Sequence, residues 1–267
     1  NAWVDYSYFA GSPPANFYAS APLVAAVLDS DKGIYTGGNV SPSTKHLKNL
    51  MLMSAASSAT STTNGRQEVA VCDYLLYYPF IDTDAIGEEQ VMDNTVTLPR
   101  YAAQGGQVVA VAQSAASAIG QFTFSYTNQD GVSGRTSQNN YTFIVAGGGQ
   151  VVGASGAGAS YNPFCYLQVG DTAVRSIESV TMSAAGGGLM CLVIVKPLIK
   201  TVVSQECRRT TTGNLESYGA CTELSSVIHQ AGAPRILDGA VIGLLAAGYS
   251  GSLASSILSG ALEVIWN

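Results

Sequence analysis

An acidic segment carries the most specific spacing of chemistry-bearing side chains in this sequence. It places carboxylates at its first and third positions (Asp82, Asp84), a glycine at the sixth (Gly87) and a carboxylate at the twelfth (Asp93). This spacing is similar to that of a calcium-binding loop. The fifth position is Ile86, however, and a bidentate Glu is expected at the twelfth. We therefore expect no metal site, and Asp82, Asp84 and Asp93 are the candidate ligands if the loop does bind calcium.

Nucleophiles and bases are few. The two histidines are His46 and His229, and the thiols that best suit a thiol–base pair are Cys207 or Cys221 with His229. No G-x-S-x-G motif is completed, and the cysteines lack a family signature. Carboxylates near aromatic residues, such as Asp73, have the residue type for glycoside cleavage, but such pairs occur by chance in most proteins. We expect that the protein is not an enzyme and binds no cofactor.

Aromatic side chains gather in the first 44 residues, where Pro and Gly are too frequent for a long helix or a central strand. We predict that residues 1–44 form an extended N-terminal arm. Exposed aromatic side chains in such an arm need a surface to lie on, either the chain's own body or a neighbouring subunit. The candidate interface residues are Trp3, Tyr6, Tyr8, Phe9, Phe17 and Tyr18.

Residues 45–267 are predicted to form one antiparallel β-sandwich, jelly-roll-like, whose C-terminal strands return to the same core. Short apolar segments separated by Gly, Pro, Asn and Asp turns are typical of sandwiches and barrels. Phe122, Phe124 and Tyr126 alternate with polar residues, so one face of that strand lies on a core.

The mainly β class leaves room for a few short helices, at 112–119, 222–230 and 252–262. We expect Pro197 to end the last predicted strand, because proline cannot donate to a ladder of hydrogen bonds. The predicted strands are 47–53, 68–78, 91–98, 107–112, 121–127, 141–145, 166–169, 176–182 and 189–195.

Charge is scarce, at 11% of residues against about 25% in an ordinary soluble domain. The net charge of −6 disfavours a nucleic-acid partner, because binding phosphate requires clustered Lys and Arg. The uncharged stretch 239–262 is long enough to span a bilayer, but its centre, 248–252, favours a turn between two buried segments. No signal-peptide pattern is present. We expect neither nucleic acid nor membrane as a partner, and interfaces where unpaired charge would be costly.

The five cysteines lack metal-binding spacing. Cys72, Cys165 and Cys191 lie in apolar segments and are predicted to be buried thiols that act as small hydrophobes. Cys207 and Cys221 flank a polar loop. They are either paired or, as is usual for a protein made in the cytosol, free.

Several segments, in one consistent order from residue 72 to the end, resemble a family of virion structural proteins encoded by tailed bacteriophages. The resemblance implies a head decoration protein or another head-associated component, and it implies no catalytic residues. The glycine-rich segment 146–159 departs most from it. The segments that carry it are CDYLLYYPFID (72–82), DNTVTLPRY (93–101), YTNQDGVSGR (126–135), VKPL (195–198), PRILDG (234–239) and VIWN (264–267).

These observations together lead us to expect a decoration or cement protein on the capsid surface of a bacteriophage virion, made in the host cytoplasm. Its partners would be the major capsid protein and copies of itself, as a trimer, with many weak interfaces adding through multivalency. A tail-tube or other tail structural protein is one alternative. A carbohydrate-binding surface module, in which exposed Tyr77, Tyr78 and Tyr101 stack on sugars, is another.

Overall fold

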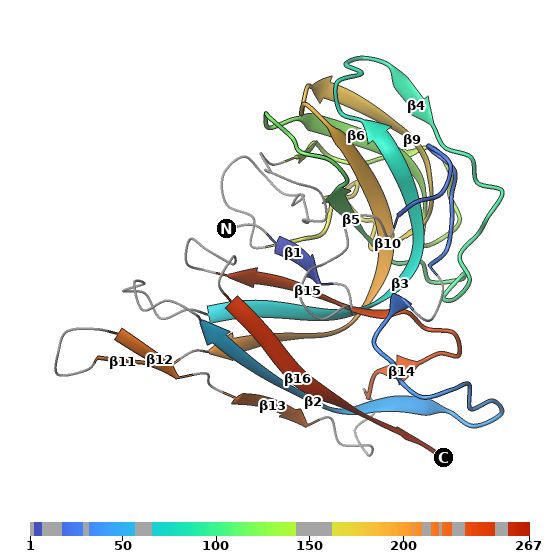
Figure 1. Ribbon diagram of the computed structural model, residues 1–267. Helices are drawn as coiled ribbons and strands as arrows, with labels where there is room; N and C mark the ends of the chain where they lie inside the picture. The colour runs from blue at the N-terminus through green and yellow to red at the C-terminus, as the bar shows by residue number, and fades with distance from the viewer. Residues whose placement is uncertain are drawn as a thin grey trace.

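The computed structural model describes ten segments of the chain, and its named strands all pair antiparallel (Figure 1). The predicted mainly β, antiparallel sandwich class is therefore confirmed. The described residues are 3–6, 18–28, 32–56, 66–142, 162–204, 206–209, 215–218, 221–225, 233–248 and 256–267.

Two long strands organise the molecule. β3 (Arg66–Asp82) and β10 (Leu189–Ser204) pair along nearly their whole lengths. They form the centre of a sheet with the order β1-β15-β3-β10-β5. The outer strands of this central sheet are β1 (Trp3–Tyr6), β15 (Ile242–Gly248) and β5 (Gln107–Ala112).

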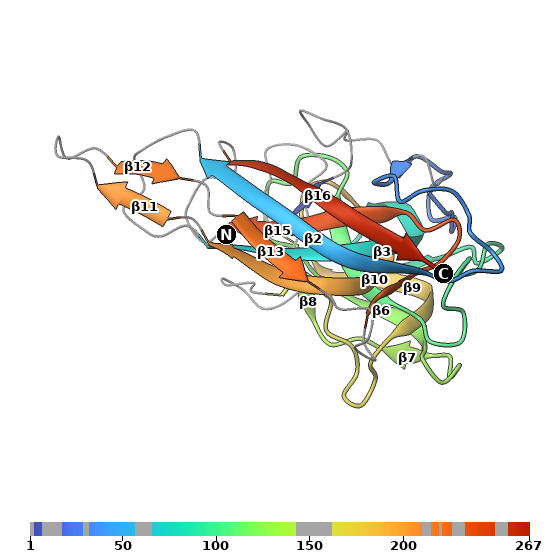
Figure 2. The same ribbon diagram turned by 90° about the horizontal axis from the view of Figure 1, so that it is seen from below.

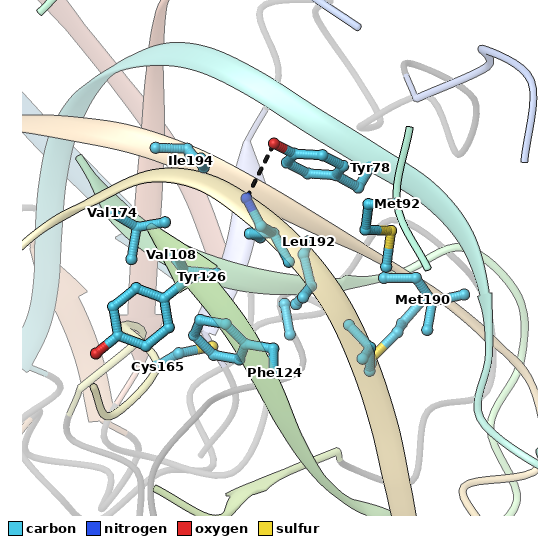
Figure 3. Close-up of a cluster of buried hydrophobic side chains, with 14 of the residues drawn as sticks. Tyr78, Met92, Val108, Phe124, Tyr126, Cys165, Val174, Met190, Leu192 and Ile194 are labelled. Carbon is cyan, nitrogen blue, oxygen red and sulfur yellow. Dashed lines mark hydrogen bonds between the residues drawn. The ribbon is translucent and has the colours of Figure 1, made fainter. Parts of the chain in front are cut away.

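A second sheet packs on one end of the central sheet and has the order β4-β9-β6-β7, with β8 also paired to β6. Phe122, Phe124 and Tyr126 on β6 are buried between the two sheets, as the alternating pattern predicts (Figure 3). We call the cluster of buried side chains between these two sheets, which also includes Leu76 and Tyr78 of β3, the upper core. The strands of the second sheet are β4 (Glu89–Val91), β6 (Gln121–Asn128), β7 (Arg135–Thr136), β8 (Asn140–Tyr141) and β9 (Val174–Ala184).

A third sheet packs on the other end of the central sheet, and β3 and β10 run through both regions (Figure 1). Leu47 and Leu50 from this sheet meet Val69 and Val71 of β3 in what we call the lower core. The strands of this sheet are β2 (Lys45–Ala56), β13 (Cys221–Ser225), β14 (Arg235–Ile236) and β16 (Ser256–Trp266). A separate two-stranded ribbon consists of β11 (Glu206–Arg209) and β12 (Leu215–Tyr218).

A bulge lets one face of β3 serve both cores. The register of β3 against β10 shifts between Tyr74 and Leu76, where Leu75 is the extra residue. Val71 belongs to the lower core, whereas Leu76 and Tyr78 belong to the upper core. Because strand side chains alternate and a bulge adds one residue, odd-numbered positions before it and even-numbered positions after it share a face.

Residues 18–28 pair with the edge of β3 and place Tyr18 on the opposite face of the central sheet. Ala26 exchanges backbone hydrogen bonds with Tyr77 of β3 (2.9 and 3.0 Å). Tyr18 is only 5% exposed, and its ring centroid lies 5.3 Å from that of Tyr77. The prediction of Tyr18 as an intersubunit contact is therefore wrong, because the chain's own sheet buries it. The backbone of β1, which includes Trp3 and Tyr6, pairs with β15; Tyr8, Phe9 and Phe17 lie outside the described residues.

Three predicted helices are not found where the structure describes the chain. Ala112 ends β5 and residues 113–119 are irregular, 221–225 form β13, and 256–266 form β16. Both strands pair with β2, so tertiary pairing overrides the local helix signal. The predicted strand 166–169 is irregular, and of 91–98 only Val91 is in a strand. Among the described residues, no helix has the length and apolarity needed to cross a membrane.

Pro197 lies inside β10 rather than at its end, contrary to prediction. Its neighbour β5 pairs with β10 only as far as Val195, so that edge of β10 has no β5 partner from Lys196 onward. The register also shifts between Pro197 and Ile199. Proline is tolerated at strand edges and bulges, because its missing N–H is not needed there.

The predicted buried thiols are confirmed. The side chains of Cys72, Cys165 and Cys191 are all buried. The side chains of Cys207 and Cys221 lie outside the described part of the structure, so their pairing stays a prediction.

A buried ion pair lies between the upper and lower cores. Arg100, from the loop between β4 and β5, donates from Nε and Nη2 to the two oxygens of Asp73 on β3 (2.8 and 2.7 Å). The Asp73 side chain is fully buried and also accepts from the backbone N–H of Val241 (3.0 Å). Arg100 donates further to the carbonyl of Tyr74 (3.0 Å). The pair thus joins the loop, β3 and the segment that leads into β15.

Replacing Arg100 with Met should lower the free energy of unfolding by about 3–5 kcal/mol, because Asp73 would keep a buried charge without its cation. The matched control is Lys48→Met, which breaks the exposed pair between Lys48 and Glu263 and should cost at most about 1 kcal/mol. Urea denaturation of both variants measures the difference. Equal losses would contradict a structural role for the buried pair.

Candidate functional site

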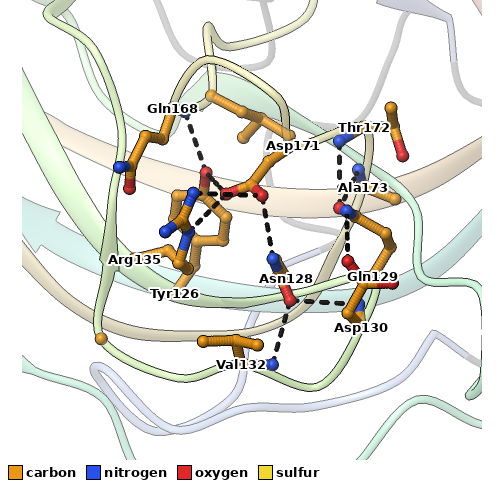
Figure 4. A network of polar contacts seen from close by, with 12 residues as sticks. Tyr126, Asn128, Gln129, Asp130, Val132, Arg135, Gln168, Asp171, Thr172 and Ala173 are labelled. Atoms are coloured by element: carbon orange, nitrogen blue, oxygen red, sulfur yellow. Dashed lines mark hydrogen bonds and ion pairs between the residues drawn. The ribbon is translucent and has the colours of Figure 1, made fainter.

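A buried carboxylate organises two loops at one end of the second sheet (Figure 4). Asp171 accepts hydrogen bonds from the Tyr126 hydroxyl (2.7 Å), the Asn128 amide (2.8 Å) and Nε of Arg135 (2.9 Å). The Tyr126 hydroxyl in turn accepts from the backbone N–H of Gln168 (2.9 Å). The two loops, residues 128–135 and 166–173, are thereby fixed to each other through charge-assisted bonds, which are the stronger class.

The same loops are tightened by two side-chain amides. The Asn128 oxygen accepts from the backbone N–H groups of Asp130 and Val132 (both 3.0 Å), as in an Asx turn. The Gln129 oxygen reaches the other loop and accepts from Thr172 and Ala173 (3.0 and 3.3 Å). These bonds give acceptors to backbone N–H groups that have no partner in a neighbouring strand, so the loops have a defined shape.

Apolar side chains project from these fixed loops. Val132 is 51% exposed and Val169 is 86% exposed. A single exposed valine is ordinary on a protein surface. Here, however, the two lie on loops that Asp171, Asn128 and Gln129 hold rigid. We call residues 128–135 and 166–173 the loop surface. Rigid loops lose little entropy on binding, so the loop surface is suited to contact a partner.

The network changes the titration of its members. The hydrogen bonds from Arg135, together with those from Tyr126 and Asn128, lower the pKa of Asp171 to about 2. Burial, with the adjacent Asp171 carboxylate, raises the pKa of Tyr126 to about 12. Asp171 therefore stays ionised, and Tyr126 protonated, over a wider pH range than the free side chains do, and these are the states that their mutual hydrogen bond requires.

The candidate calcium ligands do not converge on one point. Asp82 accepts from the N–H of Asp84 (2.8 Å), and Asp84 accepts from the N–H of Gly187 (2.9 Å). Asp93 accepts from the N–H of Thr95 (2.9 Å). Asp82 and Asp93 therefore stabilise local turns, whereas Asp84 joins its loop to the segment before β10. In the part of the chain that the structure describes, no group of three or more His, Cys, Asp or Glu side chains is placed to hold a metal ion.

The residues of the other predicted sites do not come together in the structure either. Asp73 is bound to Arg100 and is not exposed to a substrate. His46 is half-buried and its Nδ1 lies 3.4 Å from the Ala233 carbonyl, while His229 lies outside the described residues. Tyr77 and Tyr78 are buried, so the expectation that these two rings stack on sugars is wrong. Tyr78 instead donates to Asn94 (2.7 Å) inside the upper core.

The loop surface was missed by sequence reasoning, although its signal was present. Residues 126–135 are rich in turn-forming Asn, Asp and Gly, but nothing local indicates that Arg135 meets Asp171, 36 positions later. Tyr126 was correctly predicted to face a core, yet its hydroxyl reaches the polar end of the sheet. Only the pairing of β6 with β9 brings these groups together.

Comparisons with protein-family models, with curated proteins and with solved structures give no match. The proposals below therefore rest on the sequence and the geometry of this chain.

Replacing Asp171 with Asn should remove charge-assisted bonds and cost about 1.5–3 kcal/mol of unfolding free energy at pH 7. The effect should depend on pH. Because the pKa of Asp171 is lower in the folded chain than in the unfolded chain, its ionised form stabilises the fold above about pH 4, and this contribution is lost as the pH falls towards 2.

Chemical denaturation of both proteins between pH 2 and 7 tests this prediction. The two stabilities should converge at the acid end, since the wild-type carboxylate is then protonated. A constant difference across the whole range would show that the Asp171 charge does not contribute.

Proposed function

We propose that this protein is a structural component of a bacteriophage virion, a decoration or cement protein that binds the major capsid shell. The observation that carries the proposal is the rigid loop surface with exposed Val132 and Val169. Such a surface is already shaped for contact, and nothing around it among the described residues forms a catalytic centre. The resemblance of several segments to tailed-phage virion proteins, including residues 126–135 within this surface, supplies the identity of the partner.

A second feature supports an assembly role. In both views the ribbon of β11 and β12 stands out from the sheets at one end of the molecule (Figures 1 and 2). An isolated two-stranded ribbon is at best marginally stable in water. Contact with a neighbouring subunit would stabilise it. The scarcity of charge agrees with this role, since surfaces covered after assembly are depleted of charged residues at their centres.

Residues 3–6 and 18–28, within the predicted arm, are attached to the chain's own sheets by backbone hydrogen bonds. The proposal therefore places the main contact on the loop surface and the ribbon. The proposal also includes a trimer of this chain on the shell, in which each copy makes several weak contacts. The alternative is a tail-tube or other tail protein, which would polymerise into rings or tubes by itself.

Purified protein added to undecorated shells and imaged by cryo-electron microscopy tests the proposal. We expect regular added density on the shell surface, and shells that resist heating better. The double variant Val132→Ser/Val169→Ser should bind about tenfold to a hundredfold more weakly, because two apolar side chains no longer leave water on binding.

The matched control is Ile86→Ser/Val91→Ser. These side chains are also exposed (55% and 64%), but they lie outside the loop surface, since Ile86 bridges Met182 near the far end of β9 and Val91 pairs with Ser179 at its middle. This control should bind as the wild type does. Shells without added density would overturn the decoration proposal, and spontaneous rings or tubes would favour the tail alternative. Equal binding by both double variants would remove the loop surface as the contact.

A further inference from the structure

An open pocket of about 580 Å³ lies where β5 begins and the edge of β10 is left uncovered, and it shares residues 129–130 and 172–173 with one side of the loop surface. This volume falls within the range of about 300–1,000 Å³ that small-molecule sites occupy. Three segments and the β10 edge form its walls. The lining residues are 103–107, Gln129 and Asp130, Thr172 and Ala173, and Lys196 and Pro197.

The walls are held rigidly. Nη2 of Arg175 donates to the carbonyls of both Ala103 (2.9 Å) and Gln129, which joins two of the lining segments. Gly106 exchanges backbone hydrogen bonds with Val174 (2.9 and 2.8 Å). A Cβ added at Gly105 would lie 2.6 Å from the Val174 carbonyl oxygen, so only glycine permits this close approach. The pocket is therefore already formed before anything binds.

The pocket offers a mixed set of hydrogen-bonding groups. The Lys196 ammonium, which also lies 5.5 Å from the centroid of the Tyr101 ring, supplies donors. The carboxylate of Asp130 and the side-chain oxygen of Gln107 supply acceptors, while Nε2 of Gln107 is already bound to the Thr172 carbonyl. Gln104 is exposed, and its side-chain amide makes no hydrogen bond to the described residues. This side chain therefore offers both a donor and an acceptor.

This composition restricts the class of ligand. Lys196 and Asp130 are the charged lining residues and have opposite charges, while the Arg175 guanidinium behind the wall already donates to the Ala103 and Gln129 carbonyls, so the lining offers no cluster of like charges to a phosphate or a cation. An apolar ligand would leave the polar groups without partners, which is costly. Hydroxyl groups both donate and accept, and therefore match a set of alternating donors and acceptors.

We propose that this pocket binds a neutral, hydroxyl-rich ligand, a saccharide. Its polar walls would hydrogen-bond the sugar hydroxyls, with Gln104 and Lys196 at the open side. The site differs from the tyrosine platform expected from the sequence, since Tyr77 and Tyr78 are buried. Sugar binding is a property of the isolated chain and does not depend on shell binding, so the two proposals can fail separately.

Screening the purified chain on an array of neutral oligosaccharides, with sialylated and uronate-containing glycans beside them, tests the proposal. Titration calorimetry then measures the affinity for the glycan bound best. Gln104→Ala and Lys196→Met should each weaken binding about tenfold or more. The control Glu88→Ala removes an exposed polar side chain between Gly87 and β4, outside both the pocket lining and the loop surface, and it should leave affinity unchanged.

Retention of neutral glycans that both pocket variants weaken would support the site. Three results would overturn it: no neutral glycan retained, binding of acidic glycans only, or affinity unchanged in both pocket variants. Thermal melting checks that each variant is folded. If Lys196→Met does not fold, Gln104→Ala decides the question, because the Gln104 side chain makes no hydrogen bond to the described residues.

Discussion

The buried ion pair between Asp73 and Arg100 lies where the two cores meet, and the rest of the fold depends on it. β3 and β10 are long enough to contribute to two cores. Their apolar residues alone do not determine where one core ends and the other begins. A buried carboxylate must be neutralised and fully hydrogen-bonded, and Arg100 and the N–H of Val241 meet that demand. The loop that carries Arg100 is thereby fixed between the second and third sheets.

The same loop connects the ion pair to the candidate ligand pocket. Tyr101, next to Arg100, has a left-handed backbone (φ 54°), which a bulky residue adopts only when its surroundings hold it there. Its hydroxyl donates to the Arg235 carbonyl (3.3 Å), and its ring contacts Lys196. Residues 103–107, which line the pocket, follow directly. One segment of chain therefore contributes both to stability at the junction of the cores and to the shape of the pocket.

The two proposals use different solutions to the same physical problem. The loop surface and the pocket are both made largely of loops. Mobile loops would bind a partner or ligand more weakly, because ordering them costs binding free energy. A buried Asp171 fixes the first, and Arg175 fixes the second by joining Ala103 to Gln129. Few charges are present in this chain, and Asp73, Arg100, Asp171, Arg135 and Arg175 hold loops or core junctions together.

Local patterns of residues are enough to predict the class of fold and several details within it. Alternation of Phe122, Phe124 and Tyr126 fixed the buried face of β6, and apolar segments identified the buried cysteines, because burial follows directly from side-chain chemistry. Other features follow from packing alone: β16 is a strand, Pro197 lies within β10, Tyr18 and Tyr78 are buried, and Arg135 contacts Asp171. Each depends on a partner distant in sequence. Local patterns carry hydrophobicity and turn chemistry, but which strands become neighbours is set by the packing of the whole chain.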